Sequence, residues 1–270
     1  MRIAHIVNPF AAAEASDLAI AQPITFTTMK NAASFGKHEA EVSLWSAQFS
    51  EDLPMVPEGF SPTPDLERSI LDVRTFHIPR KLPLIKDILD RLYHHSDARC
   101  LVYTNVDIAL QPYFYGLVAR FFQQGYDAFV INRRTIPGNY KTVAEIPLML
   151  AEVGERHPGW DCFAFERSLY PEFKLGAACI GSGWIGRVMI TNMACLAKNF
   201  NVFADLHLTF HIGNEKVWRS GAFDDYTEHN KNECCKILLA FEKKYGPFDR
   251  KQLPGRFLNQ LETTATGTRK

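Results

Sequence analysis

Short hydrophobic runs alternate with stretches of helical periodicity along most of this chain. The runs are rich in β-branched and aromatic residues, which favour strands, whereas apolar residues recur at helical spacing in the longer stretches. The predicted strands cover residues 2–8, 41–48, 100–107, 127–132, 161–165 and 202–212. The predicted helices cover residues 16–35, 82–95, 112–124 and 230–245, with one more beginning after Gly181-Ser182-Gly183. This alternation predicts an α/β domain with a mixed, mostly parallel central sheet flanked by helices.

Prolines and weak periodicity interrupt this outline. Pro23 is expected to break or restart the helix over 16–35, because proline removes a helical hydrogen bond. The prolines between residues 52 and 65 predict a loop. Residues 134–160 are expected to be mostly loop, with a short helix near 143–153.

Composition places the chain among ordinary globular proteins, with 46% hydrophobic and 22% charged residues. We expect one domain over residues 1–250 and a polar tail over 251–270 whose end is disordered, since ETTATGTRK is almost free of apolar residues. Thirty basic residues balance thirty acidic ones, so no overall field favours nucleic acid.

No apolar run reaches the roughly 18 residues that a membrane-spanning helix needs. The N-terminus reads as a first strand rather than a signal peptide. The six cysteines contain no C-x-x-C pair and lie mostly in apolar segments, which favours reduced thiols and a cytoplasmic location.

An acid ends one of the hydrophobic runs. The segment Cys100–Val106 leads directly to Asp107, with Asn105 two residues before it and so on the same face of a strand. A carboxylate at the end of a buried strand is costly to desolvate unless it is paired, and ligands bind at that end of open α/β sheets. Asp107 is therefore either a cap for the next segment or a site residue.

A late segment presents two histidines. Residues 205–212 alternate strictly, so a strand would place Asp205, His207, Thr209 and His211 on one face. Imidazole and carboxylate groups bind divalent cations, but a solvated sheet face gives the same pattern. The metal interpretation gains value only if His207 or His211 converges on Asp107.

A third candidate group surrounds Trp160. A ring next to the carboxylate of Asp161 suits sugar binding, because the ring stacks on C–H faces while the acid accepts hydroxyl hydrogen bonds. Such an acid, or Glu166 just beyond it, is also able to deprotonate an acceptor hydroxyl. A packing tryptophan beside an acid at the start of a strand explains the pattern equally well.

The hexapeptide Gly181–Gly186 matches G-x-G-x-x-G and predicts, as an alternative, a dinucleotide-binding turn of an NAD(P)-dependent oxidoreductase. The strand before it, 177–180, is short, and Trp184 puts a bulky ring where phosphate would approach. The chain contains no Walker loop, no G-x-S-x-G elbow and no H-E-x-x-H motif.

Taken in order, these segments resemble nucleotide-sugar-dependent glycosyltransferases of the GT-A fold. The resemblance covers residues 1–220 and rests on RIAHIVNPF, KLPLIKDILDRLY, LVYTNVDI, DAFVINRR, GWDCFAF, GSGW and DLHLTFHIG. It implies a single GT-A-like domain in which TNVD is a variant of the D-x-D motif.

The resemblance also implies roles for particular residues. Asp107 would bind the metal, Asn105 would be the variant first position, and His207 or His211 the late ligand. The cation would be Mn²⁺ or Mg²⁺, weakly bound because an amide replaces the first acid. Donor contacts are expected from Asn8, Lys86, Asn105, Asp107, Arg133 and Arg134, and acceptor or sugar contacts from Trp160, Gly183 and Trp184. Asp161 is the first candidate for the catalytic base and Glu166 the second.

The leading hypothesis is a cytoplasmic glycosyltransferase that moves a sugar from a nucleotide-sugar donor to a hydroxyl acceptor, which we expect to be a glycan. The alternatives are the oxidoreductase and a non-catalytic sugar- or nucleotide-binding module. The sequence leaves open the sugar, the base, the acceptor, the stereochemical outcome and the oligomeric state.

Overall fold

A computed structural model describes residues 1–214 and 221–247. The strands are β1 Arg2–Val7, β2 Glu41–Ser46, β3 Ser61–Pro62, β4 Cys100–Thr104, β5 Ala109–Leu110, β6 Ala128–Ile136, β7 Glu155–Glu166, β8 Phe200–Phe203 and β9 Thr209–Ile212. The α-helices are α1 Asp17–Phe35, α2 Ile85–His95, α3 Phe114–Gln123, α4 Ile146–Ala151, α5 Ile185–Leu196 and α6 Asp224–Tyr245. The 3-10 turns include η1 Ser50–Met55 and η2 Ile70–Asp72.

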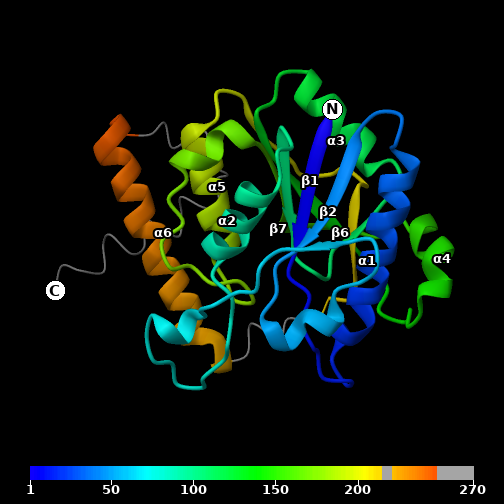
Figure 1. The fold of residues 1–270 in the computed structure, drawn as a ribbon, viewed down its shortest axis with the longest axis horizontal. Coiled ribbons are helices and arrows are strands. Elements are labelled where there is room, and N and C mark those ends of the chain that lie inside the picture. The colour runs from blue at the N-terminus through cyan, green and yellow to red at the C-terminus, as the bar shows by residue number, and fades with distance from the viewer. Residues whose placement is uncertain (215–220, 248–270) are drawn as a thin grey trace.

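The strands form one sheet with the order β3-β2-β1-β4-β7-β6-β9-β5, and β8 also pairs with β6. Most neighbours are parallel, but β7 runs antiparallel to β4 and β6, and β5 runs antiparallel to β9. Helices α2, α5 and α6 cover one face, while α1 and α3 cover the other (Figure 1). The predicted fold, a mixed and mostly parallel sheet flanked by helices, is confirmed.

Strand β4 lies at the centre of this core. All five of its residues are buried, with Leu101 and Tyr103 in the core on the α2 side and Cys100 and Val102 in the core on the α1 side. A strand covered on both faces needs apolar residues at every position, which explains its continuous hydrophobic run. This burial fixes the place where β4 ends and the polar residues after it begin.

Several predicted boundaries were wrong. Helix α1 continues through Pro23, because packing of one side of the helix outweighs the single lost hydrogen bond. The predicted strand over 202–212 is two strands, β8 and β9, separated by turns at 204–208. Strands β6 and β7 extend into 134–160 from both sides. The predicted tail over 251–270 lies outside the described residues.

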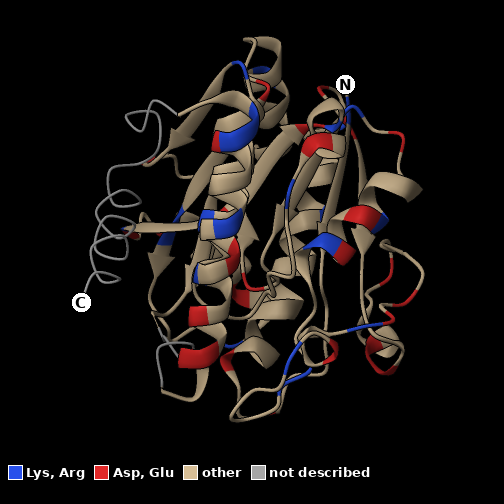
Figure 2. Cartoon of the chain, turned by 90° about the vertical axis from the view of Figure 1, so that its left-hand side faces the viewer, with Lys and Arg blue, Asp and Glu red and all other residues tan. Residues whose placement is uncertain are grey.

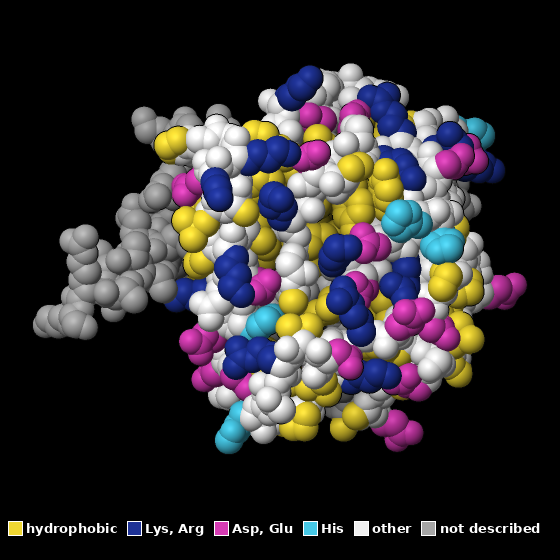
Figure 3. Space-filling model, turned by 60° about the vertical axis from the view of Figure 1, so that its left-hand side comes forward, with side chains coloured by type: hydrophobic (Ala, Val, Ile, Leu, Met, Phe, Trp, Pro, Cys, Tyr) yellow, Lys and Arg dark blue, Asp and Glu magenta, His cyan; other side chains and the backbone are white. Residues whose placement is uncertain are grey.

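Charges are mixed over the side of the molecule that carries α6. Figure 2 shows Lys and Arg interspersed with Asp and Glu there, and the space-filling view in Figure 3 shows the same mixture with hydrophobic side chains between the charges. Neither sign of charge therefore dominates the described part of this side. Among the helices of the described ranges, none is long and apolar enough to span a bilayer.

His5 on β1 gives a first testable property. Its ring is fully buried and lies 2.8 Å from the Tyr115 hydroxyl and 2.9 Å from the Thr104 hydroxyl. Burial lowers the pKa of His5 to about 3. The unfolded chain therefore binds a proton between pH 6.5 and about 3 that the folded protein does not bind, so stability falls as pH falls through this range.

Because of His5, we expect the unfolding free energy to fall by about 2 kcal/mol when the pH is lowered from 7 to 5. The slope is about 1.4 kcal/mol per pH unit below pH 6.5. Urea titrations at the two pH values measure it. His5→Gln carries no titrating proton, so its stability should fall by about 2 kcal/mol less than that of the wild type. Equal losses in the two proteins would refute this assignment.

Candidate functional site

The chain turns sharply where β4 ends. Strand β4 stops at Thr104, and the Ile108 N–H donates to the Asn105 carbonyl over 3.2 Å, which closes a turn over 105–108. The prediction that the strand runs to Asp107 was therefore wrong. Because of the turn, the two polar side chains are not alternate residues of one strand: Asn105 contacts β7 and Asp107 contacts β9.

Asp107 meets the late histidine segment. Its Oδ2 lies 3.2 Å from Nε2 of His211, and Nδ1 of His211 lies 2.9 Å from the Gly213 carbonyl oxygen. That carbonyl accepts the Nδ1 proton, which directs the other ring nitrogen toward Asp107. The convergence on which the metal interpretation depended thus exists, and His211 is the histidine that makes it.

Electrostatics favours an ion pair at this contact. Burial alone raises the pKa of Asp107, but the hydrogen bond and charge of His211 and the charge of Arg133 outweigh it, so the pKa lies below its ordinary value. Burial lowers the pKa of His211, yet Asp107 outweighs burial and the net pKa is raised. Oδ1 of Asp107 is buried and accepts no hydrogen bond within the described structure.

Asp161 on β7 forms the second half of the site. Its Oδ1 accepts a hydrogen bond from Nδ2 of Asn105 at 3.1 Å, and its Oδ2 lies 3.1 Å from the guanidinium of Arg133 on β6. Oδ2 accepts no hydrogen bond, so the contact with Arg133 is an ion pair without hydrogen-bond direction. Burial raises the pKa of Asp161, and Arg133 opposes that rise only in part. Arg133 also acts on Asp107 and so links the two halves.

A β-bulge aims Asp161. Along the β6–β7 ladder, Ile131 pairs with Cys162 and Asn132 pairs with Trp160, so Asp161 is the extra residue between them. An extra residue breaks the strict alternation of side chains and redirects the bulged one. The bulge therefore explains how an acid inside a hydrophobic strand turns toward Arg133 and Asn105.

Buried polar atoms without hydrogen-bond partners gather on these elements. Buried polar groups are normally satisfied, so unsatisfied ones are places where water, an ion or a ligand supplies partners. On β6, β7 and β9 and in the turn after β4, the unsatisfied atoms are Asp107 Oδ1, Asn132 Oδ1, Arg133 Nε, Thr135 Oγ1, Asp161 Oδ2 and Thr209 Oγ1. The sequence interpretation missed Asn132 and Thr135, although the bulged β6 segment next to Arg133 carries both.

Trp160, on β7 next to Asp161, and Trp184, directly before α5, both lie near Arg187. Trp184 has a left-handed backbone with φ of 73°, which is strained for a residue with a side chain. The Arg187 guanidinium lies 4.5 Å from the ring of Trp184 and 5.7 Å from that of Trp160. A Cβ added at Gly186 would lie 3.0 Å from the Trp160 carbonyl oxygen, so this glycine lets α5 approach Trp160 closely.

The structure of residues 177–186 does not support the alternative of a dinucleotide-binding turn. The expected strand over 177–180 does not form: Cys179 makes only an isolated bridge with Leu84. A Cβ at Gly183 would lie 3.0 Å from Cγ2 of Thr227 on α6, so close helix packing explains that glycine. The Gly181–Gly186 turn is therefore not the strand-to-helix turn that binds pyrophosphate.

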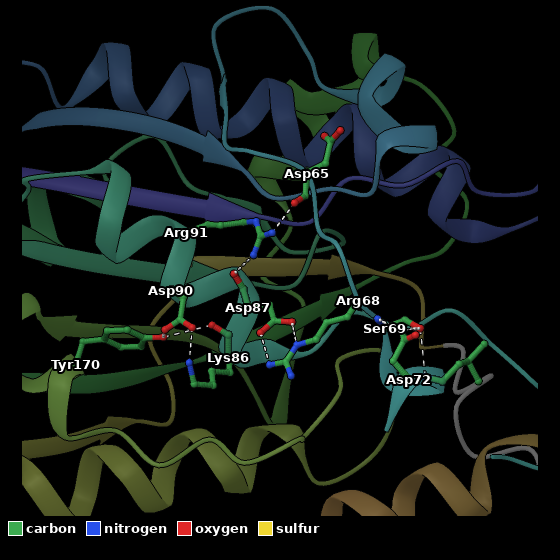
Figure 4. A network of polar contacts seen from close by, with 10 residues as sticks. Asp65, Arg68, Ser69, Asp72, Lys86, Asp87, Asp90, Arg91 and Tyr170 are labelled. Carbon is green, nitrogen blue, oxygen red and sulfur yellow. Dashed lines mark hydrogen bonds and ion pairs between the residues drawn. The ribbon is translucent and has the colours of Figure 1, made fainter. Parts of the chain in front are cut away.

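Two of the predicted site residues, Lys86 and Glu166, lie away from Asp107 and Asp161, because the elements that carry them end elsewhere in the fold. Lys86 on α2 pairs with Asp90 in a polar network that also includes Tyr170 (Figure 4). Glu166 pairs with Arg99 beside the start of β4, because antiparallel β7 carries its last residue to the opposite edge of the sheet. Neither side chain contacts Asp107 or Asp161, so a direct role for Glu166 as the base does not fit the geometry.

Three further predicted residues have partners of their own. Arg134 pairs with Asp205 and donates to the carbonyls of residues 153 and 154. His207 lies in the turn between β8 and β9, with Nε2 3.0 Å from the Gln111 amide, so it does not share a strand face with His211. Asn8 follows β1 at the same edge as the end of β4 and donates to the Ala47 carbonyl over 2.6 Å.

Few side chains at this site are able to coordinate a cation, and such a small set suits a cation that a bound ligand also coordinates. Over residues 1–214 and 221–247 there is no cluster of three or more His, Cys, Asp or Glu side chains able to hold a metal. Within these ranges, Asp107 and His211 form a pair of such side chains, so a cation held by them would need further ligands. Magnesium-type ions in nucleotide enzymes commonly rely on one or two carboxylates, with phosphates and water completing the shell. The free, buried Oδ1 of Asp107 fits that arrangement.

Comparison with known proteins gives similarity of fold. No family model and no curated protein matches the chain. Among solved structures, S. aureus TarS 1–349 in complex with UDP-GlcNAc matches with a TM-score of 0.51 and 11% identity, covering 96% of this chain and 78% of that one. The same protein in complex with UDP matches with a TM-score of 0.52 and 11% identity, covering 97% and 78%. At this identity the likeness establishes the fold, and the predicted GT-A-like fold class is confirmed.

Proposed function

We propose that this protein is a glycosyltransferase that moves a sugar from a nucleotide-diphosphate donor to a hydroxyl group of a glycan acceptor. The observation that carries the proposal is the Asp107–His211 pair, with one buried carboxylate oxygen free, next to the Arg133–Asp161 pair. A fold shared with a protein that binds UDP-GlcNAc and UDP supports the choice of donor.

The donor diphosphate would lie at the carboxyl edge of the sheet beside Asp107. The Arg133 guanidinium supplies positive charge within reach of it. Asp107 and His211 would hold Mn²⁺ or Mg²⁺, which when bound acts as a Lewis acid on the phosphate oxygens of the leaving nucleoside diphosphate. Asn8 follows β1 at this same edge, and we propose that it also contacts the donor.

Asp161 is the proposed base. The acceptor oxygen would attack the anomeric carbon, the bond from that carbon to the diphosphate would break, and the hydroxyl proton would pass to Asp161. A raised pKa makes a carboxylate a better base near neutral pH, and burial raises the pKa of Asp161. The adjacent Trp160 would stack on the acceptor ring.

A thermal-shift screen tests the proposal. UDP and GDP are added with and without Mn²⁺, alongside NAD and NADP. We expect UDP or GDP to raise the melting temperature when Mn²⁺ is present, and NAD and NADP to have no effect. A shift with NAD alone would contradict the proposal. A nucleotide-binding protein that releases no UDP from UDP-sugars in the presence of glycan acceptors would instead be a non-catalytic binding module.

The close approach of Gly138 to Gly213 supports a prediction about His211. Gly213, whose carbonyl holds the His211 ring, packs on Gly138, and a Cβ added at Gly138 would lie 3.3 Å from the Gly213 Cα. Gly138→Val should displace that carbonyl and weaken Mn²⁺-dependent binding of UDP about tenfold, as loss of an outer-shell partner does. Isothermal titration calorimetry measures it.

The matched control is Gly116→Ala on α3, where the new Cβ makes only ordinary contact, 3.5 Å from the Glu39 side chain. This variant should bind as the wild type does. Unchanged affinity in a folded Gly138→Val protein would show that the contact between Gly138 and Gly213 does not position His211.

A further inference from the structure

The side-chain amide of Asn105 has a protein partner at each end. This residue is the variant first position of the D-x-D motif, where a metal ligand is expected. Its Oδ1 accepts a hydrogen bond from the Tyr103 hydroxyl at 3.1 Å, and its Nδ2 donates to Oδ1 of Asp161 at 3.1 Å. Both ends of the amide therefore have partners other than a cation.

Charge fixes the direction of this amide. An ionised carboxylate only accepts hydrogen bonds, so the NH₂ end of Asn105 has to face Asp161. The oxygen end then faces Tyr103, whose hydroxyl donates. A flipped amide would bring two acceptor oxygens within about 3 Å of each other, which is repulsive.

The contact also follows from the register of the sheet. In the antiparallel β4–β7 ladder, Tyr103 pairs with Phe163 and Thr104 pairs with Cys162. One step further, Asn105 stands opposite Asp161, and its N–H donates to the Asp161 carbonyl over 3.3 Å. Opposed residues of neighbouring strands contact each other without any ligand. Asp107 lies beyond the turn and contacts a different strand, so the two polar residues of TNVD serve different partners.

We propose that Asn105 is a positioning residue for Asp161, oriented by Tyr103, and that it is not a ligand of the cation. The inference rests on the proposed function, because it assumes that Asp161 acts on the acceptor. It assigns the protein part of the cation site to Asp107 and His211. It also explains why position 105 carries an amide instead of a carboxylate: an ionised acid there would be unable to donate a hydrogen bond to Asp161 and would repel it.

Two variants test the inference through two separate measurements. Asn105→Ala removes the amide, and Tyr103→Phe removes only the hydroxyl that orients it. The affinity for Mn²⁺ in the presence of UDP is measured by electron paramagnetic resonance, and turnover by release of UDP from UDP-sugars. We expect both variants to keep the Mn²⁺ affinity within about twofold, while kcat falls about tenfold in Asn105→Ala and less in Tyr103→Phe. His211→Ala is the control that should lose Mn²⁺ affinity.

A double-mutant cycle completes the test. In an Asp161→Asn background, Asn105→Ala should cost almost no further turnover, because the group that it positions is already gone. A tenfold or larger loss of Mn²⁺ affinity in Asn105→Ala, or a full additional loss of kcat in the double variant, would overturn the inference while leaving the proposed function intact. A wild-type protein that binds neither UDP nor Mn²⁺ would overturn the proposed function, and this inference with it.

Discussion

Asp107→Ala is expected to abolish the Mn²⁺-dependent part of UDP binding, with at least a hundredfold loss of affinity in calorimetric titrations. Within residues 1–214 and 221–247, the acid that pairs with His211 is Asp107, and its free oxygen is buried at the point where the diphosphate is proposed to lie. A cation with few protein ligands loses most of its protein-derived affinity when its one carboxylate is removed.

The two histidines of the late segment provide a matched pair for this prediction. His211→Ala should lose Mn²⁺-dependent binding as Asp107→Ala does, because His211 contacts Asp107. His207→Ala should bind as the wild type does, because His207 lies in a turn against Gln111. Thermal unfolding of each variant without ligand separates loss of the site from loss of the fold. Retained Mn²⁺ dependence in a folded Asp107→Ala protein would reject the central assignment.

The sequence was a sound guide to β4 and to the acid beyond it. A strand buried on both faces leaves a continuous hydrophobic run, and a carboxylate directly after such a run has to find a partner. The pattern did not reveal the turn over 105–108, because Val106 and Ile108 continue the apolar alternation of a strand, although Asn105 and Asp107 are residue types that favour turns. Asn105 and Asp107 were predicted to share one face of a strand, and they do not: Asn105 contacts β7 and Asp107 contacts β9.

The errors at Glu166 and His207 have a different origin. The local sequence shows which polar residues lie near the end of a strand, but the direction of that strand in the sheet depends on its pairing with distant segments. Strand β7 is antiparallel, so its last residue, Glu166, is carried away from the edge where β4 ends. Strict alternation over 205–212 looked like one strand, but the turns between β8 and β9 remove His207 from it. The bulge at Asp161 is also non-local, since it exists only relative to β6.

The second large effect is expected at Asp161. Asp161→Asn keeps the size and one hydrogen-bond acceptor but removes the base, so kcat should fall by about 10²- to 10⁴-fold, while UDP binding with Mn²⁺ stays within a few-fold of the wild type. Release of UDP from UDP-sugars in the presence of acceptor measures kcat. Arg133 loses its ion-pair partner in this variant, so its thermal unfolding is measured in parallel.

The matched control for Asp161 is Glu166→Gln. Both acids lie on β7, but Glu166 pairs with Arg99 at the opposite edge of the sheet, so its variant should keep kcat within about twofold. The pH profile adds an independent check, because a base acts only when deprotonated and burial raises the pKa of Asp161. Wild-type kcat/KM should therefore fall as pH drops through a value above that of an ordinary aspartate, and Asp161→Asn should lose this acid limb. An inactive Glu166→Gln variant beside an active Asp161→Asn variant would refute the assignment of Asp161 as the base. The antiparallel course of β7 places Glu166 at the far edge of the sheet, so the geometry favours Asp161.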